Sequence, residues 1–201
     1  MMEQRLQSGL AALNLPVEGI PALVRYGALL IEPNKVMNLT AITDPEDVAT
    51  LHFLDSAALL TLESFSGKSV VDVGTGAGFP GLPLRVLEPS IRLTLLDSLN
   101  KRIQFLETVC RELDLPDVAC VHARAEEFAA EHRETFDLAV SRAVAALPVL
   151  CELCLPLVKP GGKFLAMKSV ESDAELAAAQ HAIAILGGAV EAVRDYAIPG
   201  T

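Results

Sequence analysis

The sequence predicts an α/β fold, in which helices cover both faces of a doubly wound, mostly parallel sheet. Three features of the chain predict it: short apolar runs typical of buried strands, helical patterns between these runs, and a glycine-rich turn directly after the first run. Strands that alternate with helices at this spacing pair in parallel, because each helix forms the crossover to the next strand. We expect strands at residues 70–73, 92–96, 119–122, 138–141 and 164–168.

An N-terminal helical cap is expected to precede this core. Residues 20–31 have helical spacing that Pro33 interrupts, and a capping box at Thr43 and Glu46 is expected to begin a further helix. The cap is expected to pack on the core. The predicted boundaries are 1–66 for the cap and 67–201 for the core.

Helices and one tight turn are expected to connect the strands of the core. Pro160-Gly161-Gly162 predicts a turn before the fifth strand, and residues 190–196 predict a final short strand. The helical patterns lie at residues 82–87, 101–113, 126–131, 148–158 and 173–186.

The charge balance limits how this chain can bind nucleic acid. It contains 16 Lys and Arg against 26 Asp and Glu, so the net charge is −10, whereas a protein that binds RNA through its overall charge is usually basic. Any RNA contact must therefore use a local basic patch. No stretch resembles a signal peptide or a membrane span, so we expect a cytoplasmic protein with no membrane partner. Cys151-x-x-Cys154 lacks a second ligand pair, so no metal site is expected.

The glycine-rich turn is compatible with two nucleotide cofactors. Gly76, Gly78 and Gly81 match the G-x-G-x-x-G pattern of dinucleotide sites, where a pyrophosphate rests on a helix start. In the other register Asp72 precedes Gly74. A carboxylate there suits a ligand with an ammonium and a sulfonium group better than a pyrophosphate. The acid favours S-adenosylmethionine, while an NAD(P)-dependent oxidoreductase and a non-catalytic nucleoside-binding module remain alternatives.

Further ligand contacts are expected where the later strands end, because ligands bind at the carboxyl ends of parallel strands. Asp97 follows the second strand and can accept hydrogen bonds from ribose hydroxyls, or cap the next helix. Glu126, or the backbone of Ala125, follows the third strand and can bond the edge of an adenine. Arg142 ends the fourth strand, where a methyl acceptor would meet the donor. Its alternative role is that of an ion-pair partner of Asp137 or Glu126.

Six sequence blocks occur in an order that is typical of one family. They are Asn38-Leu39-Thr40, His52-x-x-Asp55-Ser56, Asp72-Val73-Gly74-Thr75-Gly76-x-Gly78-x-Pro80-Gly81, Leu95-Leu96-Asp97-Ser98-x-x-Lys101-Arg102-x-x-Phe105-Leu106, Arg124-Ala125-Glu126-Glu127 and Ser141-Arg142-Ala143. Together they resemble the small-subunit ribosomal RNA methyltransferase G family, also called glucose-inhibited division protein B. Many methyltransferases share the glycine motif, whereas the blocks around Lys101 and Arg142 are more specific.

The resemblance implies a Rossmann-like class I methyltransferase that uses S-adenosylmethionine to methylate N7 of a guanine in 16S rRNA near the decoding centre. Its substrate would be the small ribosomal subunit or an assembly intermediate, and we expect a monomer. Relatives continue beyond Thr201 into one more strand, so we expect this strand to be absent here. By motif, cofactor contacts fall on Gly74, Phe79, Ala125, Glu126 and Arg142, and the residue patterns add Asp72, Gly76, Gly78 and Asp97.

Guanine N7 carries a lone pair and no proton, so its methylation needs no general base. His52 is the one candidate base near a motif, and a hydrogen bond to Asp55 at a helix end is its alternative role. Arginine usually binds N7 and O6 of guanine together, but here N7 must stay free. Arg142, which would position the acceptor, or Lys101 would therefore contact O6 or a phosphate only. The expected RNA-binding patch consists of Lys101, Arg102, Arg124 and Lys168, beside Arg142.

Overall fold

A computed structural model describes residues 1–169 and 172–201, with their side chains except at residues 35–37. Within this part of the chain, five strands form one parallel sheet in the order β3-β2-β1-β4-β5, which confirms the predicted doubly wound sheet. The order reverses between β1 and β4, and ligands of such sheets bind beside this point. The strands are β1 (Ser69–Val73), β2 (Arg92–Asp97), β3 (Ala119–His122), β4 (Phe136–Arg142) and β5 (Val158–Met167).

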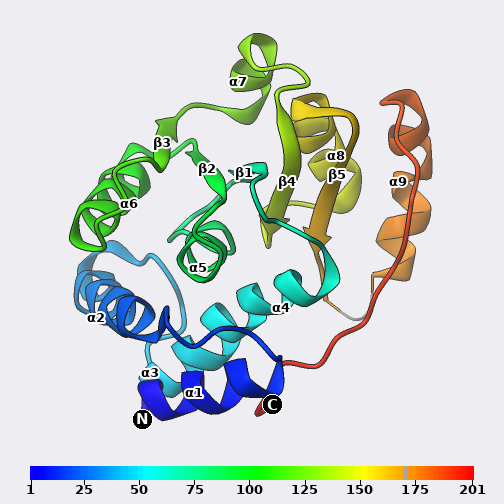
Figure 1. Cartoon of the computed structure of the whole chain (residues 1–201). Helices are drawn as coiled ribbons and strands as arrows, with labels where there is room; N and C mark the ends of the chain where they lie inside the picture. Colours follow the sequence, from blue (N-terminus) through cyan, green and yellow to red (C-terminus); the bar gives the residue numbers. More distant parts are fainter. Residues whose placement is uncertain (170–171) are drawn as a thin grey trace.

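Helices cover both faces of the sheet (Figure 1). They are α1 (Met2–Ala12), α2 (Ile20–Met37), α3 (Pro45–Asp47), the π-helical η1 (Val48–Leu54), α4 (Asp55–Leu62), α5 (Gly81–Leu87), α6 (Asn100–Glu112), α7 (Ala125–Glu131), α8 (Leu147–Cys154), the 3-10 turn η2 (Leu155–Leu157) and α9 (Asp173–Ile185). Val70 and Leu138 pack with α2, α5 and α6, while Val71 and Ala139 point to the other face, toward α7 and α8. The two central strands are apolar because both of their faces are covered. None of the described helices is both long and apolar enough to cross a bilayer.

The N-terminal helices share their apolar core with the sheet. Leu6 of α1, Leu23 of α2 and Phe53 of η1 belong to the same cluster of buried side chains as Leu82 of α5 and Leu95 of β2. Removing these side chains from water stabilises the contact between the two parts of the chain. A division of the chain at residue 66 stays a prediction.

The predicted interruption of the second helix at Pro33 is wrong. α2 continues through Pro33 to Met37. A proline inside a helix removes one backbone hydrogen bond, and here the packing of α2 in the core outweighs that loss. The helix ends instead at Asn38, whose left-handed backbone (φ 50°) is a common helix terminus.

The next helical segment begins at Asp44 rather than at the predicted capping box of Thr43. Oδ1 of Asp44 accepts the backbone N–H of Glu46 (2.9 Å) and of Asp47 (3.2 Å), which satisfies two donors that the helix start leaves unpaired. From there α3, η1 and α4 follow one another without a break. Pi-helical stretches are rare and frequently mark functional sites.

The turn predicted at Pro160-Gly161-Gly162 lies inside β5. Phe136 pairs with Val158 and Leu138 pairs with Lys163, so the ladder skips the residues between them on β5. The backbone of Gly161 has a φ of 80°, which glycine adopts without steric cost. The structure therefore has an irregularity inside the strand where the sequence predicts a turn before it, and β5 begins earlier than predicted.

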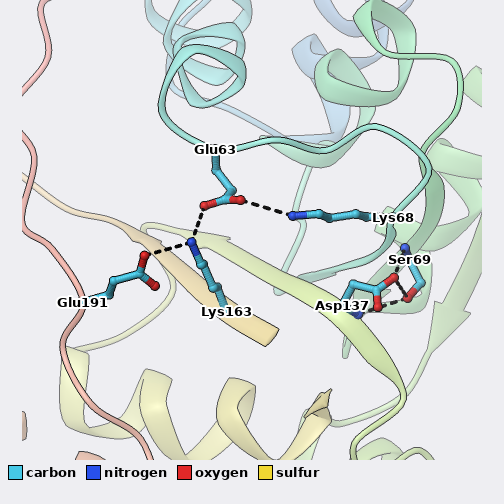
Figure 2. A network of polar contacts seen from close by, with 6 residues as sticks. All are labelled: Glu63, Lys68, Ser69, Asp137, Lys163 and Glu191. Carbon is cyan, nitrogen blue, oxygen red and sulfur yellow. Dashed lines mark hydrogen bonds and ion pairs between the residues drawn. The ribbon is translucent and has the colours of Figure 1, made fainter. Parts of the chain in front are cut away.

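Polar networks hold the amino end of the sheet together (Figure 2). Asp137 of β4 accepts both the N–H and the hydroxyl of Ser69, at the start of β1, at 2.8 Å each. Nearby, Lys163 of β5 bonds Glu63 at the end of α4 (2.8 Å) and Glu191 in the C-terminal segment (2.9 Å). These contacts connect β1 to β4, and β5 to the end of α4 and to the C-terminal segment.

The strand predicted at residues 190–196 is wrong. Residues 188–198 form neither helix nor strand, and the segment runs past α9 toward the N-terminal helices (Figure 1). Val190 and Val193 are exposed, so the alternation of the sequence buries no apolar face. Tyr196 anchors the segment through its side chain, as described below.

Candidate functional site

The glycine-rich turn after β1 is tied to the end of β2. The N–H groups of Gly74 (2.9 Å) and Thr75 (3.1 Å) both donate to the carbonyl of Leu96. Gly74 and Gly76 have φ values of 70° and 60°. A Cβ added to Gly76 would meet nothing within 4 Å, whereas one on Gly74 would meet Val144 at 2.5 Å. The backbone of Gly76 is therefore open to a ligand, while the loop after β4 covers Gly74.

Asp72 lies beneath this turn and is fully buried. Its Oδ2 accepts the hydroxyl of Thr75 (2.8 Å) and the N–H of Gly81 (2.8 Å), which joins β1 to the start of α5. Its Oδ1 is buried and has no hydrogen-bond partner among the described residues. Burial raises the pKa of Asp72 to about 6. The predicted acid thus organises the turn and keeps one oxygen unpaired.

Asp97 connects the same turn to the start of α6. Oδ2 accepts the N–H of Gly76 (2.9 Å) and a guanidinium N–H of Arg102 (3.2 Å), and Oδ1 accepts the N–H of Leu99 (2.9 Å). The carboxylate is nearly buried. Because an ionised carboxylate accepts up to about four hydrogen bonds, Asp97 can still accept one from a ribose hydroxyl.

Gly78 and Phe79 face the N-terminal helices. The space beside Gly78 is filled by Tyr26, whose hydroxyl donates to the carbonyl of Ala77. Phe79 is buried between two rings, with its centroid 4.4 Å from that of His52 and 5.5 Å from that of Tyr26. These positions therefore connect the glycine turn to α2 and η1, and their cofactor contacts stay a prediction.

Arg142 reaches from the end of β4 to η1 and α4. Its Nη1 donates to Oδ2 of Asp55 (2.7 Å) and to the carbonyl of Leu51 (3.0 Å). Its Nη2 donates to Nδ1 of His52 (2.8 Å), and its guanidinium carbon lies 5.3 Å from the centroid of Phe79. Three of the sequence blocks therefore meet at this arginine.

His52 contacts Arg142 and Thr40, so its expected hydrogen bond to Asp55 is wrong. Because a guanidinium can only donate, Nδ1 of His52 accepts from Arg142, and the ring proton lies on Nε2. Nε2 then donates to the hydroxyl of Thr40 (2.8 Å). Burial, helped by the charge of Arg142, lowers the pKa of His52 to about 4. The ring is neutral at pH 7, and its one lone pair is already engaged.

Glu126 and Ala125 lie at the start of α7. Glu126 pairs with Arg124 (3.0 Å), and both of these side chains are exposed. The alternative ion pair of Arg142 with Asp137 or Glu126 is wrong, because Arg142 bonds Asp55 instead.

Three of the residues predicted to bind RNA already pair with carboxylates of the chain. Arg102 and Arg124 make the contacts given above, and Lys168 bonds Glu175 (2.7 Å). Lys101 is exposed at the start of α6. The predicted patch is therefore a set of ion pairs whose cations would have to exchange a carboxylate for a phosphate.

Sequence reasoning missed the residues that support this cluster. The hydroxyl of Tyr196 donates to Oδ1 of Asp55 (2.7 Å), across 141 positions of the sequence. A spacing of three on a helix places His52 and Asp55 on one face, so a partner common to both, here Arg142, could have been predicted. No local signal marks Tyr196, because its contact depends on the path of the C-terminal segment.

The turn fits S-adenosylmethionine in three respects. Oδ1 of Asp72 lacks a donor that an ammonium group, directly or through a water, would supply. The backbone of Gly76 is open, and Asp97 retains acceptor capacity. One contact opposes the fit, since Val144 must move before a ligand can touch Gly74.

Comparisons with known proteins agree on one family. The model of the family described as rRNA small subunit methyltransferase G matches residues 19–198. Relatives named ribosomal RNA small subunit methyltransferase G include that of Alkaliphilus metalliredigens, 49% identical over 183 residues (90% of this chain and 77% of the relative). That of Staphylococcus epidermidis is 51% identical over 177 residues (87% and 74%). That of Geobacillus thermodenitrificans is 46% identical over 202 residues (99% and 82%).

Solved structures share the fold at low identity. A precorrin-6y C5,15-methyltransferase from Geobacter metallireducens has a TM-score of 0.51 at 16% identity and covers 76% of this chain and 74% of its own. The PH0226 protein from Pyrococcus horikoshii has a TM-score of 0.51 at 19% identity and covers 67% and 64%. This likeness confirms the predicted Rossmann-like methyltransferase fold.

Proposed function

The chain belongs to the rRNA small subunit methyltransferase G family, and we propose that it transfers the methyl group of S-adenosylmethionine to N7 of a guanine in 16S rRNA near the decoding centre. One observation supports this proposal. Gly76 and Asp97, which the residue patterns assign to the cofactor, and Arg142, which the family motifs assign, lie at the ends of β1, β2 and β4. This is the edge where open α/β sheets bind their ligands.

The proposed chemistry requires alignment rather than proton transfer. The bound cofactor supplies a methyl group on a positively charged sulfur, and guanine N7 attacks with a lone pair that carries no proton. The neutral His52, whose Nδ1 accepts from Arg142, is therefore not needed as a base. The residues of the site act by holding acceptor and donor in line, which makes the reaction effectively unimolecular.

We propose the following contacts, of which those of Asp72, Gly76 and Asp97 have the most support from the geometry of the turn. Oδ1 of Asp72 would accept from the ammonium group, and Asp97 from a ribose hydroxyl. Arg142 would bind O6 or a phosphate of the acceptor and leave N7 free. The remaining cofactor contacts are proposed at Gly74, Gly76, Gly78, Phe79, Ala125 and Glu126.

The RNA contact is proposed to form by exchange of ion pairs. Phosphates would replace the carboxylates that now bind Arg102, Arg124 and Lys168, and Lys101 would join them. Such exchange lets an acidic chain bind RNA at one place only, since the net charge of −10 repels it elsewhere. We propose that the partner is the small subunit or an assembly intermediate in the cytoplasm, and that the chain acts as a monomer.

Methyl transfer to small subunits that lack the modification tests the function. Labelled S-adenosylmethionine is expected to label one guanine of 16S rRNA at N7. Label at another atom, or no label, would overturn the proposal. Calorimetric titration with S-adenosylmethionine and with nicotinamide dinucleotides separates it from an oxidoreductase, because only the first ligand is expected to bind.

A further inference from the structure

We propose that His52 and Asp55 are positioning residues that orient Arg142 toward the methyl acceptor. The inference rests on the function proposed above and adds a role for two residues of the helical N-terminal part. His52 lies on η1 and Asp55 begins α4, whereas Arg142 ends β4. The acceptor side of the site is therefore built from both parts of the chain.

The hydrogen bonds of Arg142 leave part of its guanidinium available. Of its five N–H groups, the two on Nη1 meet Asp55 and the carbonyl of Leu51, and one on Nη2 meets His52. The other N–H of Nη2 and that of Nε have no partner among the described residues. These two groups are the ones left to bind an oxygen of the acceptor.

The guanidinium is held in one orientation. The side chain of Arg142 is only 16% exposed and that of Asp55 only 13%. The ring of Phe79 lies under the guanidinium and stacks on His52 with an interplanar angle of 12°. Side chains fixed in this way lose little entropy when a ligand binds, which is how preorganised sites gain affinity and rate.

His52 and Asp55 each bond a second residue on the side away from Arg142. His52 uses Nδ1 for Arg142 and Nε2 for Thr40 (2.8 Å), and Asp55 uses Oδ2 for Arg142 and Oδ1 for Tyr196 (2.7 Å). These second hydrogen bonds fix the side chains of His52 and Asp55, which in turn fix the guanidinium. This two-sided arrangement distinguishes a positioning role from a simple ion pair.

Two substitutions of His52 separate its two contacts. In H52N the amide oxygen lies where Nδ1 does and can accept from Arg142, whereas in H52Q the amide lies where Nε2 does and can bond Thr40. For methyl transfer to unmodified small subunits, we expect H52A to lower kcat about 100-fold, the size of effect that a misplaced group produces. H52N is expected to restore most of the rate, and H52Q is not.

The matched control lies at the other end of the same strand. D137A removes the carboxylate that bonds Ser69 and Lys159 and is expected to lower the melting temperature without changing kcat. D55A is expected to lower kcat as H52A does, with D55N between it and the wild type. An active wild type whose H52A variant keeps its kcat, or equal rates for H52N and H52Q, would overturn the positioning role. An inactive wild type would overturn the proposed function itself.

Discussion

The two ends of the sheet carry polar clusters of opposite character. At the amino end the charged side chains shown in Figure 2 are matched: Asp137 bonds Ser69, and Lys163 bonds Glu63 and Glu191. At the carboxyl end Asp72 keeps a buried oxygen without a partner. Buried polar groups without partners are costly and rare. The amino end thus has the features of a structural contact, and the carboxyl end has a feature that we expect of a binding site.

The pKa values of the carboxylates follow the same division. Hydrogen bonds from Lys159 and Ser69 hold the pKa of Asp137 well below its usual range, and those from Lys163 and Lys68 lower the pKa of Glu63. Burial instead raises the pKa of Asp72 to about 6. The fold therefore stabilises the ionised carboxylates at the amino end and destabilises one at the carboxyl end.

The largest expected effect is that of R142K. Lysine keeps the positive charge but lacks the planar fork, so it cannot bond Asp55, His52 and the carbonyl of Leu51 together. We expect kcat/KM for small-subunit methylation to fall about 100- to 1,000-fold, as when one donor to a reacting group is lost. K159R at the amino end, measured in parallel, is expected to keep the activity. Similar losses in both variants would remove the functional distinction between the two ends.

The second prediction concerns pH. The pKa of His52 is lowered from 6.5 to about 4, so its contribution to stability is present above pH 6.5 and is lost as the pH falls toward 4. The pKa of Asp72 is raised from 3.8 to about 6, so its contribution is present below pH 3.8 and is lost as the pH rises toward 6. The two effects have opposite signs and largely cancel in the wild type.

The D72N variant removes the contribution of Asp72 to this pH dependence and leaves that of His52. The pKa of Asp72 is raised from 3.8 to about 6. The difference in unfolding free energy between D72N and the wild type is therefore expected to rise by about 2 kcal/mol between pH 4 and 6, at 1.36 kcal/mol per pKa unit. Denaturant titrations at several pH values measure it, and H52N is expected to show a difference of the opposite slope. A pH-independent difference for D72N would mean that burial does not raise the pKa of Asp72.

Two glycine variants are expected to show smaller effects and to distinguish the covered position of the turn from the open one. G76A and G74A each place a side chain at positive φ, which costs about 1–2 kcal/mol. G74A should be the less stable of the two, because its Cβ meets Val144. G76A should lose more affinity for S-adenosylmethionine, because its Cβ enters the open space. Calorimetry and thermal unfolding measure both properties, and the reverse order of affinities would contradict the assignment of Gly76 as the open contact.

The ends of the sheet also differ in how far the sequence predicts them. Asp72, Asp97 and Arg142 were expected at strand ends, and parallel pairing brings these strand ends to one edge. The contacts around the turn were less predictable. Val144 covers Gly74, for example, because of the path of the loop after β4. Local periodicity predicts the ends of β2 and β4 at Asp97 and Arg142, but loop paths depend on the packing of the whole chain.

The segments outside the sheet show the limits of local patterns. Alternation at residues 190–196 predicted a strand, yet no strand in the described part of the chain pairs with it. Pro33 predicted a helix end, but tertiary packing carries α2 past it. In both cases a long-range contact, or its absence, outweighed the local preference.

The smallest expected effect is that of K163M at the amino end. It removes the cation between Glu63 and Glu191. Because ion pairs that water partly reaches contribute little, we expect only a slight fall in melting temperature. The C-terminal segment would lose one tether but keep the bond of Tyr196 to Asp55, so methyl transfer should be unchanged. K163M and Y196F measured together show which tether matters: a loss of kcat in Y196F alone would place the segment's function at the carboxyl end, where it supports Asp55. A loss of kcat in K163M would mean that the two ends of the sheet are coupled through residues 188–198. The two ends would then not be functionally separate.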